Sequence, residues 1–260
     1  MRTLLDDRAV VALSGPDART LLQGLVTNDI GALKPGIALY AALLTPQGKI
    51  LFDFLISEGE GAVLLDCAVS HAEALAKHLT MYRLRAKVEI AVRPQLAVVW
   101  GEGLTDPRLA ALGKRAIVAR AETGAGPSEA YLEHRLGLGV PEGGDFGSDR
   151  MFALDAGLEE LSGVSFEKGC YVGQELTARM KHRGTARKRL LLIQGDGALP
   201  PPGTDVVASG QSLGEVVTVY GHRGFALIRL DRLAEAGGAP VTAGNLPVRL
   251  VKQSWLDARV

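Results

Sequence analysis

Apolar residues fall into short runs along the first half of the chain, and turn-forming residues separate the runs. Two apolar runs at residues 40–56 flank Thr45-Pro46-Gln47-Gly48, and this arrangement predicts a β-hairpin. The other apolar runs of this half have the length of strands. They predict strands at residues 9–13, 62–67, 86–92, 96–100 and 115–120.

Helical periodicity alternates with these strands. A helix is predicted over Asp17–Val26, and a second one opens at Ser70 and Glu73, which have the spacing of a capping box, and runs to about Arg85. Shorter helical patterns cover Pro107–Leu112 and Ser128–Leu136. The mixture of strands and helices predicts an α+β fold rather than a regular doubly wound sheet.

The pattern changes near residue 186. From Arg187 onward, short strand-like runs are separated by glycine- and proline-rich turns, of which Leu199-Pro200-Pro201-Pro202-Gly203 is the strongest. Such spacing is typical of a small β-barrel or sandwich. We therefore predict an α+β region over residues 1–185 and a β-barrel domain over residues 186–260.

Composition limits the class of protein. The chain has 260 residues, 47% of them hydrophobic and 22% charged, which is typical of a soluble globular protein with a sizeable core. Its formal net charge is zero, so general nucleic-acid binding is not expected. No apolar run approaches the ~20 residues that span a bilayer. Two cysteines far apart make no disulfide framework, and a reducing cytoplasm is the expected location.

Several common functional motifs are missing from the sequence. It has no GxGxxG or GxxxxGK[ST] stretch for a nucleotide, no HExxH or CxxC for a metal, and no GxSxG for a nucleophilic serine. The sequence therefore gives no motif-based indication of a nucleotide site, a metal site of these kinds or a serine nucleophile.

Cys170 lies in an unusual context, the stretch SFEKGCYVGQELTARM at residues 165–180. Val172, Leu176 and Met180 recur every four residues and predict a helix that begins near the cysteine. A helix N-terminus and the positive charge of Lys168 would favour the thiolate, which is both a nucleophile and a soft-metal ligand. Spacing alone leaves open the alternative of a small buried hydrophobe. Cys67, at the end of an apolar strand, is expected to be buried.

Basic residues follow directly. The segment 179–189 holds six Lys or Arg, one His and no acid, so the rest of this neutral chain carries an excess of acids. The segment is either a solvated helix end and linker or an attractive surface for an anionic ligand or partner.

Lys168-Gly169-Cys170-Tyr171-Val172-Gly173-Gln174-Glu175 resembles the signature K-G-C-Y-x-G-Q-E of the YgfZ-type folate-binding proteins, which are relatives of the glycine cleavage T-protein, an aminomethyltransferase. Further matching blocks lie at residues 15–29, 45–53, 154–165 and 214–230. The resemblance spans most of the chain but is loose between about residues 95 and 145.

The resemblance implies a fold and a role. The fold would be a ring of three subdomains around a central channel that holds a tetrahydrofolate, with the C-terminal β-barrel as the third. The role would be a folate-binding accessory protein for assembly or repair of iron–sulfur clusters in client enzymes, including tRNA-modifying ones. Cys170 would be the functional residue and a transient cluster ligand. The candidate folate contacts are Asn28, Asp53, Lys168, Tyr171, Gln174, Glu175, Arg179 and Arg183.

Some of these residues have simpler alternatives. Asn28 suits a turn after the first helix, Tyr171 suits the core, and Glu175 is in reach of Arg179 for an ion pair that braces the motif. Asp53 is either a pterin contact or a solvent-facing strand carboxylate.

Two other functions remain open at this point. The chain resembles the aminomethyltransferase, but that family has two adjacent carboxylates where this chain has Phe52-Asp53, so one of the two acids that would handle a proton there is replaced by a ring. The second alternative is an RNA-binding module that uses residues 179–189. On the leading hypothesis the protein is a non-enzymatic factor. It would act as a monomer, with iron–sulfur client enzymes and assembly proteins as partners.

Overall fold

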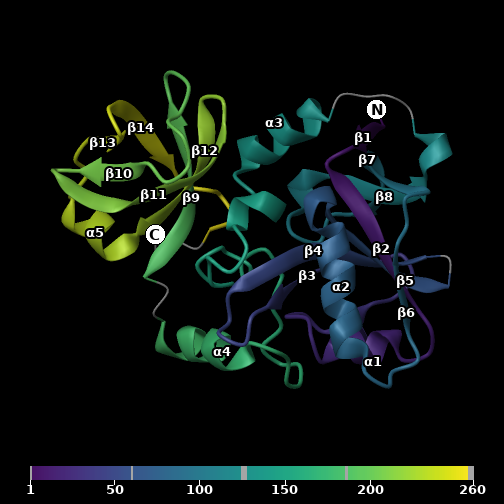
Figure 1. Ribbon diagram of the computed structural model, residues 1–260. Coiled ribbons are helices and arrows are strands. Elements are labelled where there is room, and N and C mark those ends of the chain that lie inside the picture. The colour runs from purple at the N-terminus through teal and green to yellow at the C-terminus, as the bar shows by residue number, and fades with distance from the viewer. Residues whose placement is uncertain (1, 60, 124–127, 185–186, 257–260) are drawn as a thin grey trace.

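The computed structural model describes residues 2–59, 61–123, 128–184 and 187–256, and it places two antiparallel sheets beside a β-barrel (Figure 1). One sheet has five strands in the order β3-β4-β5-β2-β6, and the other has three in the order β1-β7-β8. The strands of these sheets are β1 (Thr3–Leu5), β2 (Arg8–Ser14), β3 (Leu39–Leu44), β4 (Ile50–Gly59), β5 (Ala62–Ala68), β6 (Glu89–Val92), β7 (Leu96–Thr105) and β8 (Lys114–Ala119). The predicted α+β fold and the hairpin at residues 40–56 are confirmed.

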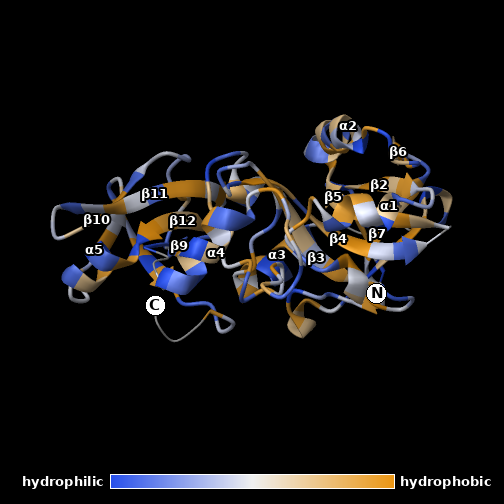
Figure 2. Cartoon of the chain, turned by 90° about the horizontal axis from the view of Figure 1, so that it is seen from below, coloured by the Kyte–Doolittle hydropathy of each residue, from blue (hydrophilic) through white to orange (hydrophobic). Residues whose placement is uncertain are grey.

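Both faces of the five-stranded sheet are buried, and alternate residues of its strands supply two separate cores. On β3, Tyr40 and Ala42 belong to the core that faces the three-stranded sheet, whereas Ala41 and Leu43 belong to the core under the helices. This follows from the two-residue repeat of a strand. Burial on both faces explains why these strands are almost continuously apolar (Figure 2).

Helices cover one face of this sheet. α1 (Ala18–Gln23) and α2 (Ala72–Arg83) pack on it through Leu22, Leu75 and Leu79. The remaining α-helices are α3 (Glu129–Leu138), α4 (Gln174–Arg183) and α5 (Leu230–Glu235). In the described part of the chain, none of the helices combines the length and hydropathy needed to cross a membrane.

The C-terminal strands close into a six-stranded barrel with the order β10-β11-β12-β9-β14-β13, as predicted. Its strands are β9 (Lys188–Gly195), β10 (Asp205–Ala208), β11 (Gln211–Tyr220), β12 (Arg223–Arg229), β13 (Val241–Ala243) and β14 (Leu246–Val251). On β9, Leu191 and Ile193 point into the barrel, whereas Leu190 and Leu192 join the core shared with the two sheets. The predicted boundary near residue 186 falls in residues 185–186, outside the described part of the chain.

Two predicted features differ from the structure. The helix predicted over Pro107–Leu112 is wrong: a single 3₁₀ turn, Ala110–Leu112, forms there after an extended Leu109. Arg108, which precedes this turn, belongs to a buried ion-pair network described below. The predicted capping box of Ser70 is also wrong, because a 3₁₀ turn precedes α2 and His71 occupies its N-cap position. The short strand β1 was not predicted.

Candidate functional site

Cys170 is exposed and lies in an irregular segment between two buried side chains, Lys168 and Tyr171. The predicted helix is present as α4, but it starts only at Gln174, so Cys170 is not at its N-terminus as predicted. The backbone first makes a turn in which the Gln174 N–H donates to the Tyr171 carbonyl at 3.2 Å.

Gly173 sets the start of α4. It is the N-cap residue and has a φ of 84°, a conformation that glycine adopts without strain. A Cβ atom at this position would lie 2.5 Å from the Thr45 carbonyl oxygen and 2.8 Å from the Leu44 Cβ. Gly48, in the turn of the β3–β4 hairpin, faces the Gly173 carbonyl from the other side. The motif thus packs directly on the hairpin that the sequence predicted.

A surface cavity of about 400 Å³ opens beside Cys170. Its walls come from Gly169, from Thr20 and Gln23 of α1, and from Gly31. The cysteine is therefore accessible to solvent and to a partner, which excludes the alternative of a buried hydrophobe.

The ammonium group of Lys168 is bound to backbone carbonyl groups. Its ammonium group donates to the carbonyl oxygens of Gln23 at 2.8 Å, Val26 at 2.6 Å and Asn28 at 2.9 Å. The residue is only 7% exposed, and burial lowers the pKa of its amine to about 8. Its charge is directed at the end of α1 and the segment that follows, whose carbonyls use all three of its N–H donors.

Cys67 is fully buried in β5, as predicted, and its thiol donates to the Ala9 carbonyl at 3.7 Å. Burial raises the pKa of this thiol to about 12. At neutral pH the group is a protonated core side chain. Cys170 is therefore the cysteine that can react with external reagents.

Asp53 is buried on β4 with 1% of its surface exposed, so the alternative of a solvent-facing carboxylate is wrong. The Tyr40 hydroxyl donates to one of its oxygens at 3.2 Å, and the Gly143 N–H donates to the other at 2.9 Å. Burial raises the pKa of this carboxyl group. Both oxygens are thus already engaged within the protein.

A second cavity, of about 480 Å³, lies beside Asn28, Tyr40, Ser162 and Phe166. The Asn28 amide nitrogen donates to the carbonyls of Tyr40 and Ser162 at 2.8 Å each, and its oxygen accepts from the Asp29 N–H. Asn28 therefore has the predicted turn role and also borders a cavity. Cys170 does not line this second cavity.

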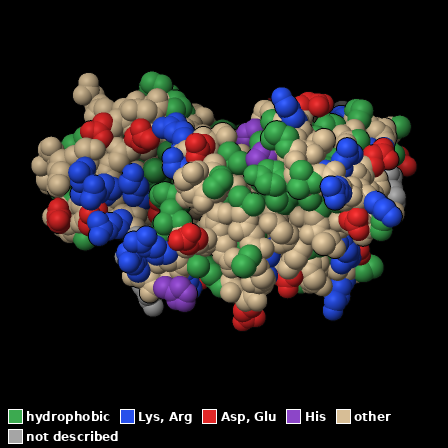
Figure 3. Space-filling view, turned by 60° about the horizontal axis from the view of Figure 1, so that its bottom comes forward, with side chains coloured by type: hydrophobic (Ala, Val, Ile, Leu, Met, Phe, Trp, Pro, Cys, Tyr) green, Lys and Arg blue, Asp and Glu red, His purple; other side chains and the backbone are tan. Residues whose placement is uncertain are grey.

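The other candidate folate contacts lie elsewhere. Tyr171 is buried in the core, as expected, and Gln174, Glu175, Arg179 and Arg183 belong to α4. Among the residues that the structure describes, Glu175 and Arg179 form no ion pair, so the predicted brace is not found. Figure 3 shows Lys and Arg side chains gathered on the side of α4 and the barrel. The predicted contacts do not converge on one cavity.

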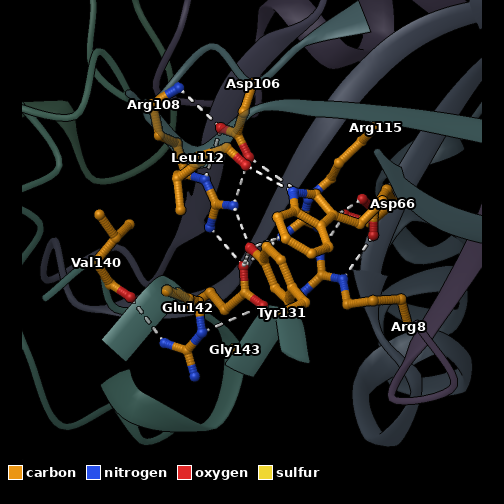
Figure 4. Close-up of polar contacts among 12 residues, drawn as sticks. Arg8, Asp66, Asp106, Arg108, Leu112, Arg115, Tyr131, Val140, Glu142 and Gly143 are labelled. Atoms are coloured by element: carbon orange, nitrogen blue, oxygen red, sulfur yellow. Dashed lines mark hydrogen bonds and ion pairs between the residues drawn. The ribbon is translucent and has the colours of Figure 1, made fainter. Parts of the chain in front are cut away.

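A buried network of ion pairs, which was not predicted, lies between the two sheets (Figure 4). Its centre is Glu142, which accepts from Arg108 at 2.6 Å, from Arg115 at 2.8 Å and from the Tyr131 hydroxyl at 3.1 Å. Burial acts to raise the pKa of Glu142, but Arg115 and Arg108 outweigh it and hold this pKa well below its usual range. Asp66 extends the network by accepting from Arg115 at 3.0 Å.

One signal of this network was present in the sequence. Asp66 interrupts an otherwise apolar strand, and a charge in such a strand needs a buried partner. Its partner Arg8 lies 58 residues away and donates to it at 2.6 Å. Sequence spacing could not reveal which arginine would pair with it.

Metal ligands are sparse around the site. In residues 2–59, 61–123, 128–184 and 187–256, no group of three or more His, Cys, Asp or Glu side chains is placed to hold a metal ion. Cys170 is thus a single soft ligand, and any metal centre bound through it needs ligands from outside this part of the chain.

Sequence comparison identifies relatives over most of the chain. The iron–sulfur cluster assembly factor IBA57 of mouse mitochondria is 37% identical over 280 residues, which cover 88% of this chain and 77% of the relative. The human mitochondrial protein of the same name is 35% identical and covers 94% of this chain and 83% of the relative. Residues 187–258 match the model of the C-terminal β-barrel domain of CAF17.

Structural comparison agrees on the fold. The aminomethyltransferase T of the glycine cleavage system from Bartonella henselae superposes with a TM-score of 0.75 at 14% identity, covering 98% of this chain and 86% of that one. The predicted T-protein-like fold is confirmed, and the YgfZ-type resemblance holds at the level of the wider family. The chain therefore belongs to the family of the iron–sulfur cluster assembly factor IBA57.

Proposed function

We propose that this protein is an accessory factor for iron–sulfur cluster assembly or repair, and that the thiolate of Cys170 is its functional group. The exposure of Cys170 in the KGCYVGQE motif, next to an open cavity, carries this proposal. The names of the mouse and human relatives support the same role. Its partners would be assembly proteins and client enzymes, tRNA-modifying ones included.

Cys170 would ligate a cluster only transiently. A cluster usually takes four cysteine thiolates, and this chain presents one at its surface. The remaining ligands would come from a partner protein, a second copy or a small thiol. Reversible thiol exchange is a further use of the same exposed group.

A matched pair of variants tests the proposal. Cys170→Ala is expected to fold normally and to leave cluster-dependent enzymes inactive in cells that lack the protein. Cys67→Ala, at the buried cysteine, is expected to restore them. Anaerobic purification of both variants, with absorption spectra and iron and sulfide analysis, measures cluster content directly. Full restoration by Cys170→Ala would remove the role proposed for the thiol.

The aminomethyltransferase alternative is less well supported by the geometry. Asp53 is the carboxylate expected at the reacting centre, but Tyr40 and Gly143 occupy both its oxygens. A general acid or base must reach the proton that it transfers. The alternative predicts methylene transfer to tetrahydrofolate from a lipoylated aminomethyl donor and its loss in Asp53→Asn. We expect no such methylene transfer by the wild-type protein.

Folate binding remains a prediction of the family resemblance. Asn28 borders the cavity beside Tyr40 and Ser162, whereas Asp53, Lys168 and Tyr171 are buried. The other four expected contacts belong to α4, so the eight residues do not form one site for a pterin and its tail. We therefore assign no step to folate. Equilibrium dialysis with tetrahydrofolate tests it, and binding by both wild type and Cys170→Ala would place the folate site apart from the thiol. The cytoplasmic location also remains a prediction, since the relatives above are named as mitochondrial proteins.

A further inference from the structure

The loop that carries Cys170 is joined to the segment after α1 by a series of hydrogen bonds. The Thr27 hydroxyl donates to the Gly163 carbonyl at 2.6 Å, and the Ser165 N–H donates to the Thr27 carbonyl at 3.0 Å. The Asn28 amide donates to the Ser162 carbonyl at 2.8 Å. Residues 162–165 are thereby fixed against residues 27 and 28.

Lys168 makes the last of these links before the cysteine. Its buried ammonium group binds the carbonyls of Gln23, Val26 and Asn28, so one side chain holds three points of the neighbouring segment. On the other side of Cys170, Tyr171 is buried in the core. Cys170 and Gly169 are both exposed between these two anchors.

The segment that Lys168 holds also forms a wall of the cavity beside Cys170. Gln23, whose carbonyl accepts from the ammonium group, lines that cavity together with Gly24. The same contacts therefore fix both the sulfur and the surface that faces it. Loss of the ammonium group would leave three carbonyls without this donor, which costs free energy wherever water cannot replace it.

We propose that Lys168 is a positioning residue for Cys170: its ammonium group clamps residues 23–28 and so fixes where the thiol is presented. The proposal rests on the function assigned to Cys170 above, and it differs from an electrostatic activation of the thiol by a neighbouring charge. A lysine suits the role because its ammonium group donates to three convergent acceptors, whereas the planar guanidinium of an arginine presents a different donor geometry.

The test compares Lys168→Met and Lys168→Arg with Lys34→Met, the same substitution at an exposed lysine of the same region. A nitroxide label on Cys170 reports its mobility, since Cys67 is buried. In Lys168→Met we expect the label to become several-fold more mobile and hydrogen exchange to rise at least tenfold in residues 23–28 and 162–171. Barrel residues 188–251 should keep their protection. Lys168→Arg should fall between Lys168→Met and wild type.

Two further measurements separate positioning from activation. The pH profile of Cys170 alkylation should keep its midpoint in Lys168→Met if the lysine only positions the thiol. Cluster-dependent enzyme activity in cells, per amount of folded protein, should fall at least tenfold in Lys168→Met and stay normal in Lys34→Met.

Three outcomes would overturn the inference. In Lys168→Met, the first is an upward shift of the alkylation midpoint by a full pH unit without increased mobility of the label. The second is an unchanged mobility of the nitroxide label on Cys170. The third is normal activity of cluster-dependent enzymes in cells. If Cys170→Ala restored activity, the proposed function would fail, yet the mobility and exchange data would still decide whether Lys168 clamps the loop.

Discussion

The hydroxyl of Tyr220 donates to Oδ1 of Asp145 at 2.9 Å, and this bond joins the barrel to the rest of the protein. Thr218, on the same strand β11, donates to the same oxygen at 2.7 Å. The other oxygen of Asp145 accepts from Arg135 at 2.6 Å and from the Glu142 N–H at 3.0 Å. One fully buried carboxylate thus connects the barrel with α3 and with the ion-pair network.

Removing the tyrosine hydroxyl should weaken this junction. Tyr220→Phe deletes a hydrogen bond to a charged group, and we expect the free energy of unfolding to fall by about 1.5 kcal/mol. Urea unfolding followed by circular dichroism measures the change. Tyr82→Phe is the control, because Tyr82 is also half-buried and its hydroxyl has no hydrogen bond within the described part of the chain. An equal loss in both variants would contradict a specific role for the Asp145 bond.

The central carboxylate of the buried network should matter more. Glu142→Gln leaves Arg108 and Arg115 without the charge that both of them contact, and breaking a buried ion pair costs about 3–5 kcal/mol. Glu215→Gln, which breaks the exposed pair with Arg150, should cost less than ~1 kcal/mol. Comparison of the two urea midpoints tests this. A loss below ~1 kcal/mol for Glu142→Gln would mean that water replaces the lost contacts.

Asp155 should make stability depend on pH. Burial raises the pKa of this carboxyl group to about 6, against the opposing charges of Arg189 and Lys188, and Oδ1 has no partner among the described residues. Between its ordinary value of 3.8 and about 6, the folded state binds more protons than the unfolded state. The contribution of Asp155 to the free energy of unfolding is therefore complete below pH 3.8 and is lost as the pH rises through about 6.

An asparagine mimics the protonated acid. At pH 7.5, Asp155→Asn should exceed wild type in free energy of unfolding by about 2–3 kcal/mol, and the two proteins should converge near pH 4. Denaturant unfolding at several pH values gives this difference. Asp196→Asn, at an exposed position, should show none. A constant gap between Asp155→Asn and wild type at all pH values would exclude titration of Asp155 as its cause.

The two cysteines should differ in reactivity. Iodoacetamide at pH 7.5 is expected to modify exposed Cys170 and to leave Cys67 unmodified, because the Cys67 thiol is buried and protonated. Mass spectrometry of the native protein should show one adduct, and Cys170→Ala should show none. Modification of Cys67 before Cys170 would show that the core opens readily.

The basic residues around α4 allow a direct test of the RNA alternative. Lys181 pairs with Glu159 and Arg189 with Glu160, whereas the other four basic residues of the segment have no acidic partner among the described residues, namely Arg179, Arg183, Arg187 and Lys188. Four free charges should give only weak RNA retention in filter binding at 50 mM salt, and this retention should fall by 200 mM. Arg183→Glu should weaken it further. Tight retention at 200 mM salt would favour an RNA-binding function instead.

The local pattern of the chain was sufficient to predict most strands and the barrel. Apolar runs bounded by turn residues depend on near neighbours, and the hairpin at residues 40–56 formed where Thr45–Gly48 indicated. The start of α4 could not be predicted in this way. The apolar repeat from Val172 continues through Gly173, but contact with a hairpin more than a hundred positions earlier fixes that glycine in a non-helical conformation.

The site was predictable in part for a similar reason. The motif singled out Cys170, and its exposure agrees with a functional thiol. The orientation of Lys168 and the burial of Asp53 depend on partners distant in sequence, respectively Gln23 to Asn28 and Gly143. The sequence alone does not show whether a polar side chain binds a residue close to it in the chain or a residue in a distant segment.

The contact between Gly48 and Gly173 has a consequence for protein engineering. Because each glycine leaves room for the backbone of the other segment, the eight-residue signature and the hairpin turn form one packing unit. A synthetic peptide of the signature, or a graft of it onto an unrelated scaffold, would carry the cysteine without the surface that shapes the chain around it. Transferring the cysteine with its conformation to another protein would require moving the signature and the hairpin turn together.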